Sequence, residues 1–180
     1  MGTLKAIGSV QDSIIFDNAG NGLWKGFILD GVTDDTEFKY VRISGASDVT
    51  EESGLVIYGG GMDLINSNPQ LSNVMINNNF GLYGGGIVLN ASNPILTDVI
   101  ISNNAVSFPI ENVLMAKGGG IYANTSSPIL TNVQIKNNYA NDGGGICLEG
   151  NSNPILNNVE IVNNTADIYT SDGSISNYSF

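Results

Sequence analysis

Four runs of three consecutive glycines recur along the chain and constrain its fold more than any other feature. They begin at Gly59, Gly84, Gly118 and Gly143, so the successive steps are 25, 34 and 25 residues. Glycine triplets are unfavourable inside helices and strands, because glycine loses more backbone entropy on folding than other residues do. The regular spacing therefore indicates a turn at a fixed place in a repeating unit.

Other residues repeat with nearly the same steps, 25, 34 and 26 residues. Asparagine pairs begin at Asn78, Asn103, Asn137 and Asn163, and prolines follow the glycine-led segments at Pro69, Pro94, Pro128 and Pro154. Short apolar segments between these markers show a period-two spacing, as at Ile87 and Leu89 and at Val99 and Ile101. This period-two spacing, bounded by Gly, Asn, Ser and Pro, predicts short strands and no helix. The 34-residue step is a 25-residue unit with nine extra residues, which lie in an inserted loop within 105–117.

The repeats predict an all-β solenoid, a parallel β-helix of about six turns with 25-residue repeats, which fills residues 1–180 as a single domain. Equivalent strands of successive turns pair in parallel, about 4.8 Å apart. Inward apolar residues then stack in columns, such as Ile76, Ile101, Ile135 and Ile161. We expect the first asparagine of each pair to form an interior ladder and the second to take the strained bend. The predicted ladder is Asn78, Asn103, Asn137 and Asn163.

The amino-acid composition narrows the range of possible functions and partners. Six basic residues oppose 17 acidic ones, giving a net charge of −11, which disfavours nucleic acid and anionic membranes as partners. Histidine is absent, so a Ser-His-Asp site is excluded. The sole cysteine, Cys147, occupies the position of Asp63, Val88 and Tyr122 in other turns. We expect it to face outward, and we assign it no redox role.

The pattern I-x-N-N-x-A-x-x-G-G-G-I at 135–146 resembles the repeat of right-handed, single-stranded parallel β-helix proteins of the pectate-lyase-like superfamily. It is also similar to the Phe-x-x-Asn and Gly-Gly-Ala-Ile repeats of polymorphic outer-membrane adhesins, with Ile in place of Phe and a third Gly in place of Ala. Residues 2–29 resemble the opening turns of β-helix regions in large secreted bacterial surface proteins. The resemblance implies a right-handed helix and an extracellular or cell-surface location.

The chain shows no signal-peptide pattern and no apolar run long enough to insert into a membrane. We expect it to be a fragment of a larger exported protein. Solenoid ends that lack caps would allow end-to-end stacking.

Two features of the sequence suggest a metal site or a catalytic site. Asp30, Asp34, Asp35 and Glu37 lie on one acidic turn and could supply oxygen ligands to calcium; otherwise they form a solvated turn. Arg42, the sole arginine, alternates with Val41 and Ile43 and should point outward. In a polyuronate lyase such a group would abstract the proton alpha to the carboxyl. No other cofactor is expected.

Aromatic residues suggest binding instead. Tyr58 and Tyr83 each precede a glycine triplet and should share a column with Lys117, and Tyr139 follows an asparagine pair. Phe108 lies in the inserted loop, which should project from the rod. Aromatic faces pack against sugars, while neighbouring polar groups bond to hydroxyls. The alternative is that these stacked aromatics only stabilise the turns.

We therefore favour a non-catalytic extracellular scaffold or adhesion module that binds a polysaccharide or a surface protein. The alternatives are a calcium-dependent polyuronate lyase that uses Arg42, and a structural spacer that binds nothing.

Overall fold

The computed structural model describes residues 2–18, 20, 24–47, 59–106 and 116–171. These residues form strands, bends and turns, and every pairing between their named strands is parallel. None of them forms a helix, and accordingly none forms one long and apolar enough to cross a membrane. The all-β, parallel character predicted from the repeats is confirmed.

The strands form three sheets. Sheet A contains β1 (Lys5–Ile7), β2 (Ile14–Phe16), β4 (Glu37–Ser44), β6 (Gln70–Asn77), β9 (Ile95–Thr97), β10 (Ile100–Ser102), β13 (Ile129–Thr131), β14 (Gln134–Lys136), β16 (Ile155–Asn157) and β17 (Glu160–Val162). Sheet B contains β3 (Phe27–Asp30), β5 (Met62–Ile65), β8 (Ile87–Asn90), β12 (Ile121–Asn124), β15 (Ile146–Glu149) and β18 (Ile168–Thr170). Sheet C pairs β7 (Phe80–Gly81) with β11 (Ala105–Val106).

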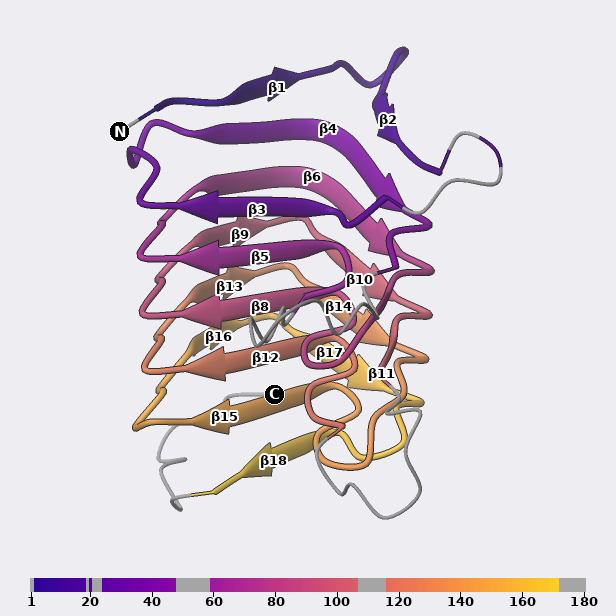
Figure 1. Ribbon diagram of the computed structural model, residues 1–180, viewed down its shortest axis with the longest axis vertical. Helices are drawn as coiled ribbons and strands as arrows, with labels where there is room; N and C mark the ends of the chain where they lie inside the picture. Colours follow the sequence, from indigo (N-terminus) through magenta and orange to yellow (C-terminus); the bar gives the residue numbers. More distant parts are fainter. Residues whose placement is uncertain (1, 19, 21–23, 48–58, 107–115, 172–180) are drawn as a thin grey trace, which may run out of the picture.

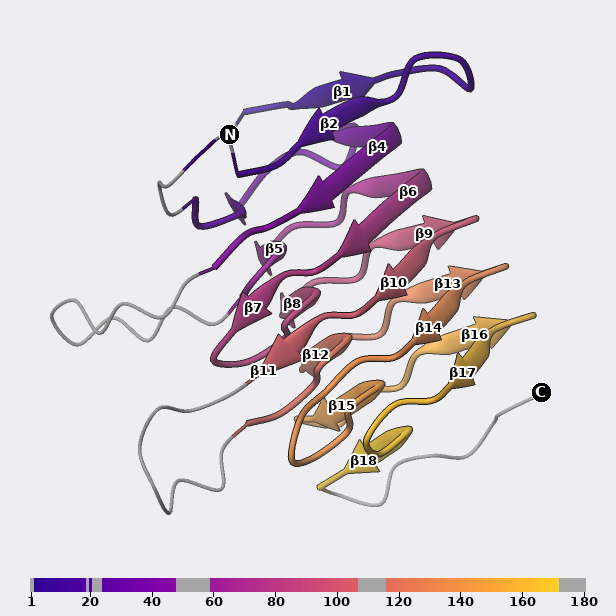
Figure 2. The same ribbon diagram turned by 90° about the vertical axis from the view of Figure 1, so that its right-hand side faces the viewer.

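The sheets stack in register, as in a solenoid. Figure 1 shows the strands of sheet B one above another on one side, with sheet A behind them. Figure 2 shows that sheet A bends between β9 and β10 and between the equivalent strands of other coils. Residues with positive φ make this bend: Tyr40, Asn73, Asp98, Asn132 and Asn158. β4 and β6 run through the bend, whereas later coils divide there into two strands.

The core lies between sheets A and B. Ile43, Ile76, Ile101 and Ile135 pair in register and are fully buried, with Ile161 at the end of the same column. Phe38, Leu71, Leu96, Leu130 and Leu156 form a second column. Burial of one such side chain contributes about 2 kcal/mol. The hydrophobic columns expected from the repeats are present.

The asparagine ladder is present, but its members are not those that the sequence predicted. Asn79, Asn104 and Asn138 are buried, and each donates its side-chain Nδ2 to the Oδ1 of the asparagine in the next coil, which ends with Asn164. These bonds are 3.0, 3.1 and 3.1 Å long. The same acceptors also take a backbone N–H.

The predicted ladder residues Asn78, Asn103, Asn137 and Asn163 instead take the bend, with φ between 55° and 57°. The left-handed backbone at the first asparagine interrupts the two-residue alternation of the strand. Consequently the second asparagine, not the first, points inward. Assigning the ladder by simple alternation was wrong for this reason.

A second buried ladder runs along the opposite corner. Ser67, Ser92, Ser126 and Ser152 are fully buried, and the hydroxyl of each accepts the backbone N–H of the serine in the preceding coil where one exists. Each hydroxyl also donates to a carbonyl within its own coil. Every serine follows a residue with positive φ: Asn66, Ala91, Thr125 and Asn151. Both corners therefore combine one left-handed residue with one inward hydrogen-bonding side chain.

The ladder predicts that two neighbouring substitutions differ strongly in their effect on stability. Asn104→Ala should lower the free energy of unfolding by about 2–4 kcal/mol, because it removes the bonds that Asn104 donates to Ile76 and Asn138 and the oxygen that accepts from the backbone N–H and Nδ2 of Asn79. Asn103→Gly should change it by less than about 1 kcal/mol, since glycine adopts positive φ readily. Urea unfolding followed by circular dichroism measures both. Equal losses would contradict the assignment.

Candidate binding face

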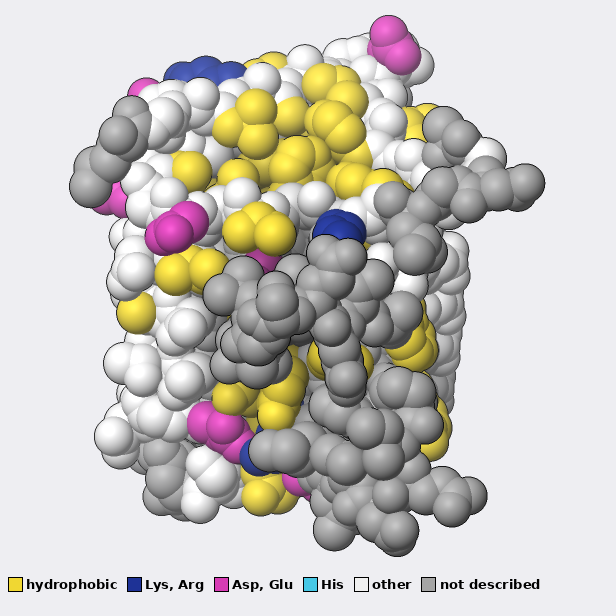
Figure 3. Space-filling view, viewed as in Figure 1, with side chains coloured by type: hydrophobic (Ala, Val, Ile, Leu, Met, Phe, Trp, Pro, Cys, Tyr) yellow, Lys and Arg dark blue, Asp and Glu magenta, His cyan; other side chains and the backbone are white. Residues whose placement is uncertain are grey.

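The outer face of sheet B carries two adjacent columns of side chains. The first, the Tyr122 column, aligns Ile28, Asp63, Val88, Tyr122, Cys147 and Tyr169. The second, the Asn124 column, aligns Asp30, Ile65, Asn90, Asn124 and Glu149. Both columns point away from the core, because alternate residues of a strand share a face. Figure 3 shows this side of the molecule; in the part drawn in colour, hydrophobic side chains are interspersed with a few charged ones.

Lys117, Glu149 and Tyr122 form a network on this face. Lys117 Nζ lies 2.5 Å from Glu149 Oε1, and the Tyr122 hydroxyl donates to Glu149 Oε2 at 2.6 Å. The bond to Glu149 raises the pKa of the Lys117 amine, and burial together with the same carboxylate raises the pKa of the Tyr122 phenol. The lysine therefore stays cationic and the tyrosine stays protonated, so the network is close to neutral overall.

Cys147 points away from the core, as its position in the repeat predicts, but it is not solvent-exposed. It is fully buried in a small cluster with Val88 and Tyr122, against which Tyr83 and Tyr169 pack. The Tyr83 and Tyr122 rings lie 5.2 Å apart, tilted by 53°. Burial, followed by the charge of Glu149, raises the pKa of the Cys147 thiol to about 12. Aromatic neighbours thus cover a residue that strand alternation alone places outside.

Asp63 begins the buried part of the Tyr122 column. It is only 5% exposed, and its Oδ1 has no hydrogen-bond partner among the described residues. Burial, with a smaller contribution from the charge of Asp30, raises the pKa of its carboxyl to about 6. Asp63 is therefore partly protonated in mildly acidic solution.

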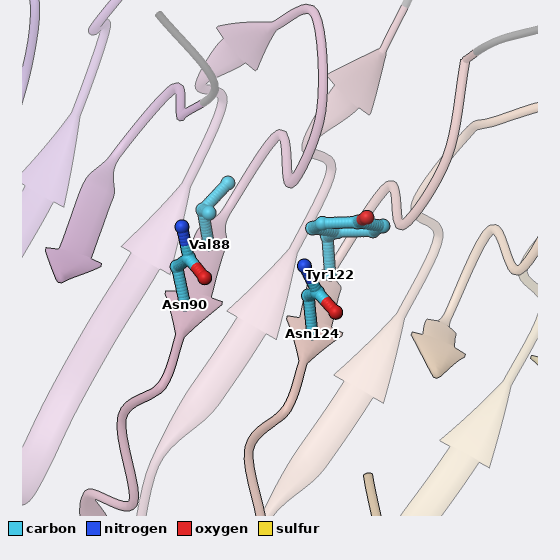
Figure 4. Close-up of a pocket in the computed structure, with 4 residues that line it drawn as sticks. All are labelled: Val88, Asn90, Tyr122 and Asn124. Atoms are coloured by element: carbon cyan, nitrogen blue, oxygen red, sulfur yellow. The ribbon is translucent and has the colours of Figure 1, made fainter. Parts of the chain in front are cut away.

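A small pocket opens between the two columns. Val88 and Asn90 line it from β8, and Tyr122 and Asn124 line it from β12. Its volume is about 60 Å³. Figure 4 shows the four side chains on neighbouring strands and on the same side of the sheet. The pocket thus combines apolar and aromatic walls with two amides.

The structure brings together some of the proposed binding residues. Tyr83 pairs with Lys117, which in turn pairs with Asp142, as their equivalent positions in the repeat predict. Tyr139 lies elsewhere, next to Ala105 in the column that also holds Ser47 and Phe80, and is 54% exposed. Tyr58 and Phe108 lie outside the described residues. Sequence analysis did not single out Tyr122, Asn124 or Glu149, although their fixed distance after a glycine triplet marks them as column neighbours.

The four acidic residues proposed as a calcium site do not form one. Asp35 accepts hydrogen bonds from Thr33 and Thr3, and Asp34 accepts one from Asn68. Asp30 ends β3 and Glu37 begins β4. Within residues 2–18, 20, 24–47, 59–106 and 116–171, no three or more His, Cys, Asp or Glu side chains are grouped to hold a metal. The carboxylates of Asp35 and Asp34 instead accept hydrogen bonds from threonine and asparagine side chains.

Arg42 points outward, as predicted, between buried Val41 and Ile43. Its guanidinium lies 3.4 Å from Asp17, and both side chains are 43% exposed. It borders a shallow groove lined by Ser13, Ile15, Val41, Asn73 and Met75. The calcium ligands that a lyase would need beside it are not assembled there among the described residues.

Comparisons with protein-family models, with curated proteins and with solved structures find no match to this chain.

The burial of Cys147 predicts that its thiol is protected in the folded protein. Labelling by a disulfide reagent such as DTNB at pH 8 should be at least about 100-fold slower in buffer than in 6 M guanidinium, because the thiol is both buried and protonated. Absorbance of the released thiolate measures the rate. Complete labelling of folded protein within the mixing time would contradict the buried position.

Asp63 predicts a defined pH dependence of stability. Its pKa rises from 3.8 to about 6 on folding, so the folded state binds the proton more tightly and ionisation destabilises it. Between pH 4 and pH 7 the wild type should lose about 2–3 kcal/mol relative to Asp63→Val, which matches Val88 in the next coil. Urea titrations at several pH values test this. A constant difference between the two proteins would show that Asp63 titrates normally.

Proposed function

We propose that the chain is a right-handed, single-stranded parallel β-helix of about six turns with a 25-residue repeat, and that it forms a non-catalytic extracellular module that binds glycans. The in-register parallel sheets support the helix. The handedness and the extracellular location rest on the resemblance of the repeat to secreted bacterial proteins.

One observation carries the binding role: the Tyr122 column lies directly beside the Asn124 column. Within the small pocket, the first column contributes Val88 and the ring of Tyr122, which are otherwise buried, and the second contributes the amides of Asn90 and Asn124. A sugar has an apolar face of C–H groups and a rim of hydroxyls. It therefore needs an apolar or aromatic surface next to hydrogen-bonding groups, which is the arrangement found here.

The electrostatics around Lys117, Tyr122 and Cys147 favour binding over catalysis. The pKa values of Lys117, Tyr122 and Cys147 are all raised, so none of these groups supplies a base or a nucleophile near neutral pH. Lys117 is moreover held by Glu149. Such a network fixes the positions of Tyr122 and Glu149, and fixed polar groups bind with a smaller entropy cost.

A surface protein as the partner, end-to-end stacking of the solenoid, a structural spacer and a polyuronate lyase remain alternatives. The spacer predicts no ligand. The lyase would act through Arg42, and the pairing of Arg42 with Asp17 together with the dispersed acidic residues gives it no support.

Binding to immobilised polysaccharides, measured by biolayer interferometry, tests the proposal. We expect at least one neutral glycan to bind, and Tyr83→Ala to weaken that binding at least about tenfold, because Tyr83 packs against Tyr122. The matched control is Ile155→Ala, which alters an exposed side chain of sheet A and should leave affinity unchanged. Circular dichroism and melting temperature establish that both variants are folded.

Three results would contradict the proposal in different ways. Equal losses in the two variants would place binding elsewhere, and no binding to any glycan would favour the spacer. Incubation with pectin and alginate, with calcium or a chelator, should give no unsaturated product in the ultraviolet. A calcium-dependent rise that Arg42→Ala abolishes would make the protein a lyase.

A further inference from the structure

We infer that the pocket between β8 and β12 accepts the acetamido group of an uncharged, N-acetylated glycan. The inference rests on the proposed function, since it specifies which sugars the outer face of sheet B binds. Three properties of the pocket lead to it: its size, the chemistry of its walls and the charge around it.

The pocket is small compared with a whole sugar ring. A volume of about 60 Å³ holds roughly four to six water molecules, at about 10–15 Å³ for each. A pyranose, with six ring atoms and several substituents, is larger than this space. A substituent of about four non-hydrogen atoms does fit, while the ring that bears it lies on the surface outside. An acetamido group, with one nitrogen, two carbons and one oxygen, has this size.

The walls of the pocket match both ends of an acetamido group. Val88 and the ring of Tyr122 provide an apolar surface, on which a methyl group loses contact with water favourably. Asn90 and Asn124 are paired in register on neighbouring strands, about 4.8 Å apart. Each carries a donor and an acceptor, so together they can bond the N–H and C=O of an amide. A hydroxymethyl group would leave the apolar walls uncovered.

The charge around the pocket disfavours a carboxylate of similar size. None of the four lining residues is charged, and Asn124 pairs with Glu149 in the next strand. Lys117, which binds Glu149, offsets that carboxylate but offers no excess positive charge. The chain as a whole has a net charge of −11. A uronate would therefore enter an environment that repels it, whereas a neutral acetamido group would not.

Two neutral trisaccharides test the inference directly. Tri-N-acetylchitotriose and cellotriose share the same β-1,4-linked backbone and differ only in an acetamido group or a hydroxyl at each second carbon. Isothermal titration calorimetry with the whole chain should show at least about tenfold tighter binding of the acetylated trimer, the effect of a few net hydrogen bonds and one buried methyl group.

Substitutions in the pocket should remove this preference. Asn124→Ala and Asn90→Ala should each weaken binding of the acetylated trimer about tenfold and leave cellotriose unaffected. Neither asparagine has a positive φ, so alanine introduces no backbone strain. The control is Gln134→Ala, which removes an amide from a groove on sheet A and should change neither affinity.

The outcomes separate this inference from the proposed function. If both trimers bind equally, or if neither binds while another glycan binds in a Tyr83-dependent manner, the acetamido inference is wrong and glycan binding stands. The inference is also wrong if Asn124→Ala and Asn90→Ala both retain the preference in folded protein. If no glycan binds at all, the proposed function and the inference both fail.

Discussion

The buried ladder of Asn79, Asn104, Asn138 and Asn164 fixes how the coils of this protein stack. Each of the first three amides donates to the next asparagine and to a carbonyl of the coil before it, so three successive coils are linked at every step. An unpaired amide at this depth would cost about 1–3 kcal/mol. A shift in register would leave every member unpaired at once, and the ladder therefore selects one register for the whole stack.

The rest of the structure depends on that register. Because the coils align residue for residue, isoleucine stacks on isoleucine in the core, and the outward residues also form continuous columns. The proposed binding face is a product of this alignment. Tyr122 and Asn124 come from one strand, and Val88 and Asn90 come from the next, and only an exact match of the two strands makes them walls of one pocket. The proposed recognition surface is therefore built from columns and not from a single loop.

Much of the fold could be predicted from the sequence, because the glycine triplets and apolar residues repeat at equivalent positions. The repeats gave the parallel β architecture, the core columns and the alignment of Tyr83 with Lys117. They did not reveal which asparagine faces inward, since one left-handed residue reverses the alternation and both asparagines tolerate that conformation. Nor did they reveal that Cys147 is covered, because the tyrosines that pack around it come from other coils. The network of Lys117, Glu149 and Tyr122 likewise joins three positions that are separate in sequence.

The proposed ligand-binding surface is the outer face of sheet B. Hydrogen–deuterium exchange with and without a saturating N-acetylated glycan tests it most directly. Peptides that cover β8, β12 and β15 should exchange more slowly in the presence of the glycan, while those that cover β9, β13 and β16 of sheet A should be unchanged. Protection confined to the strands of sheet A, or to the two ends of the stack, would contradict the account.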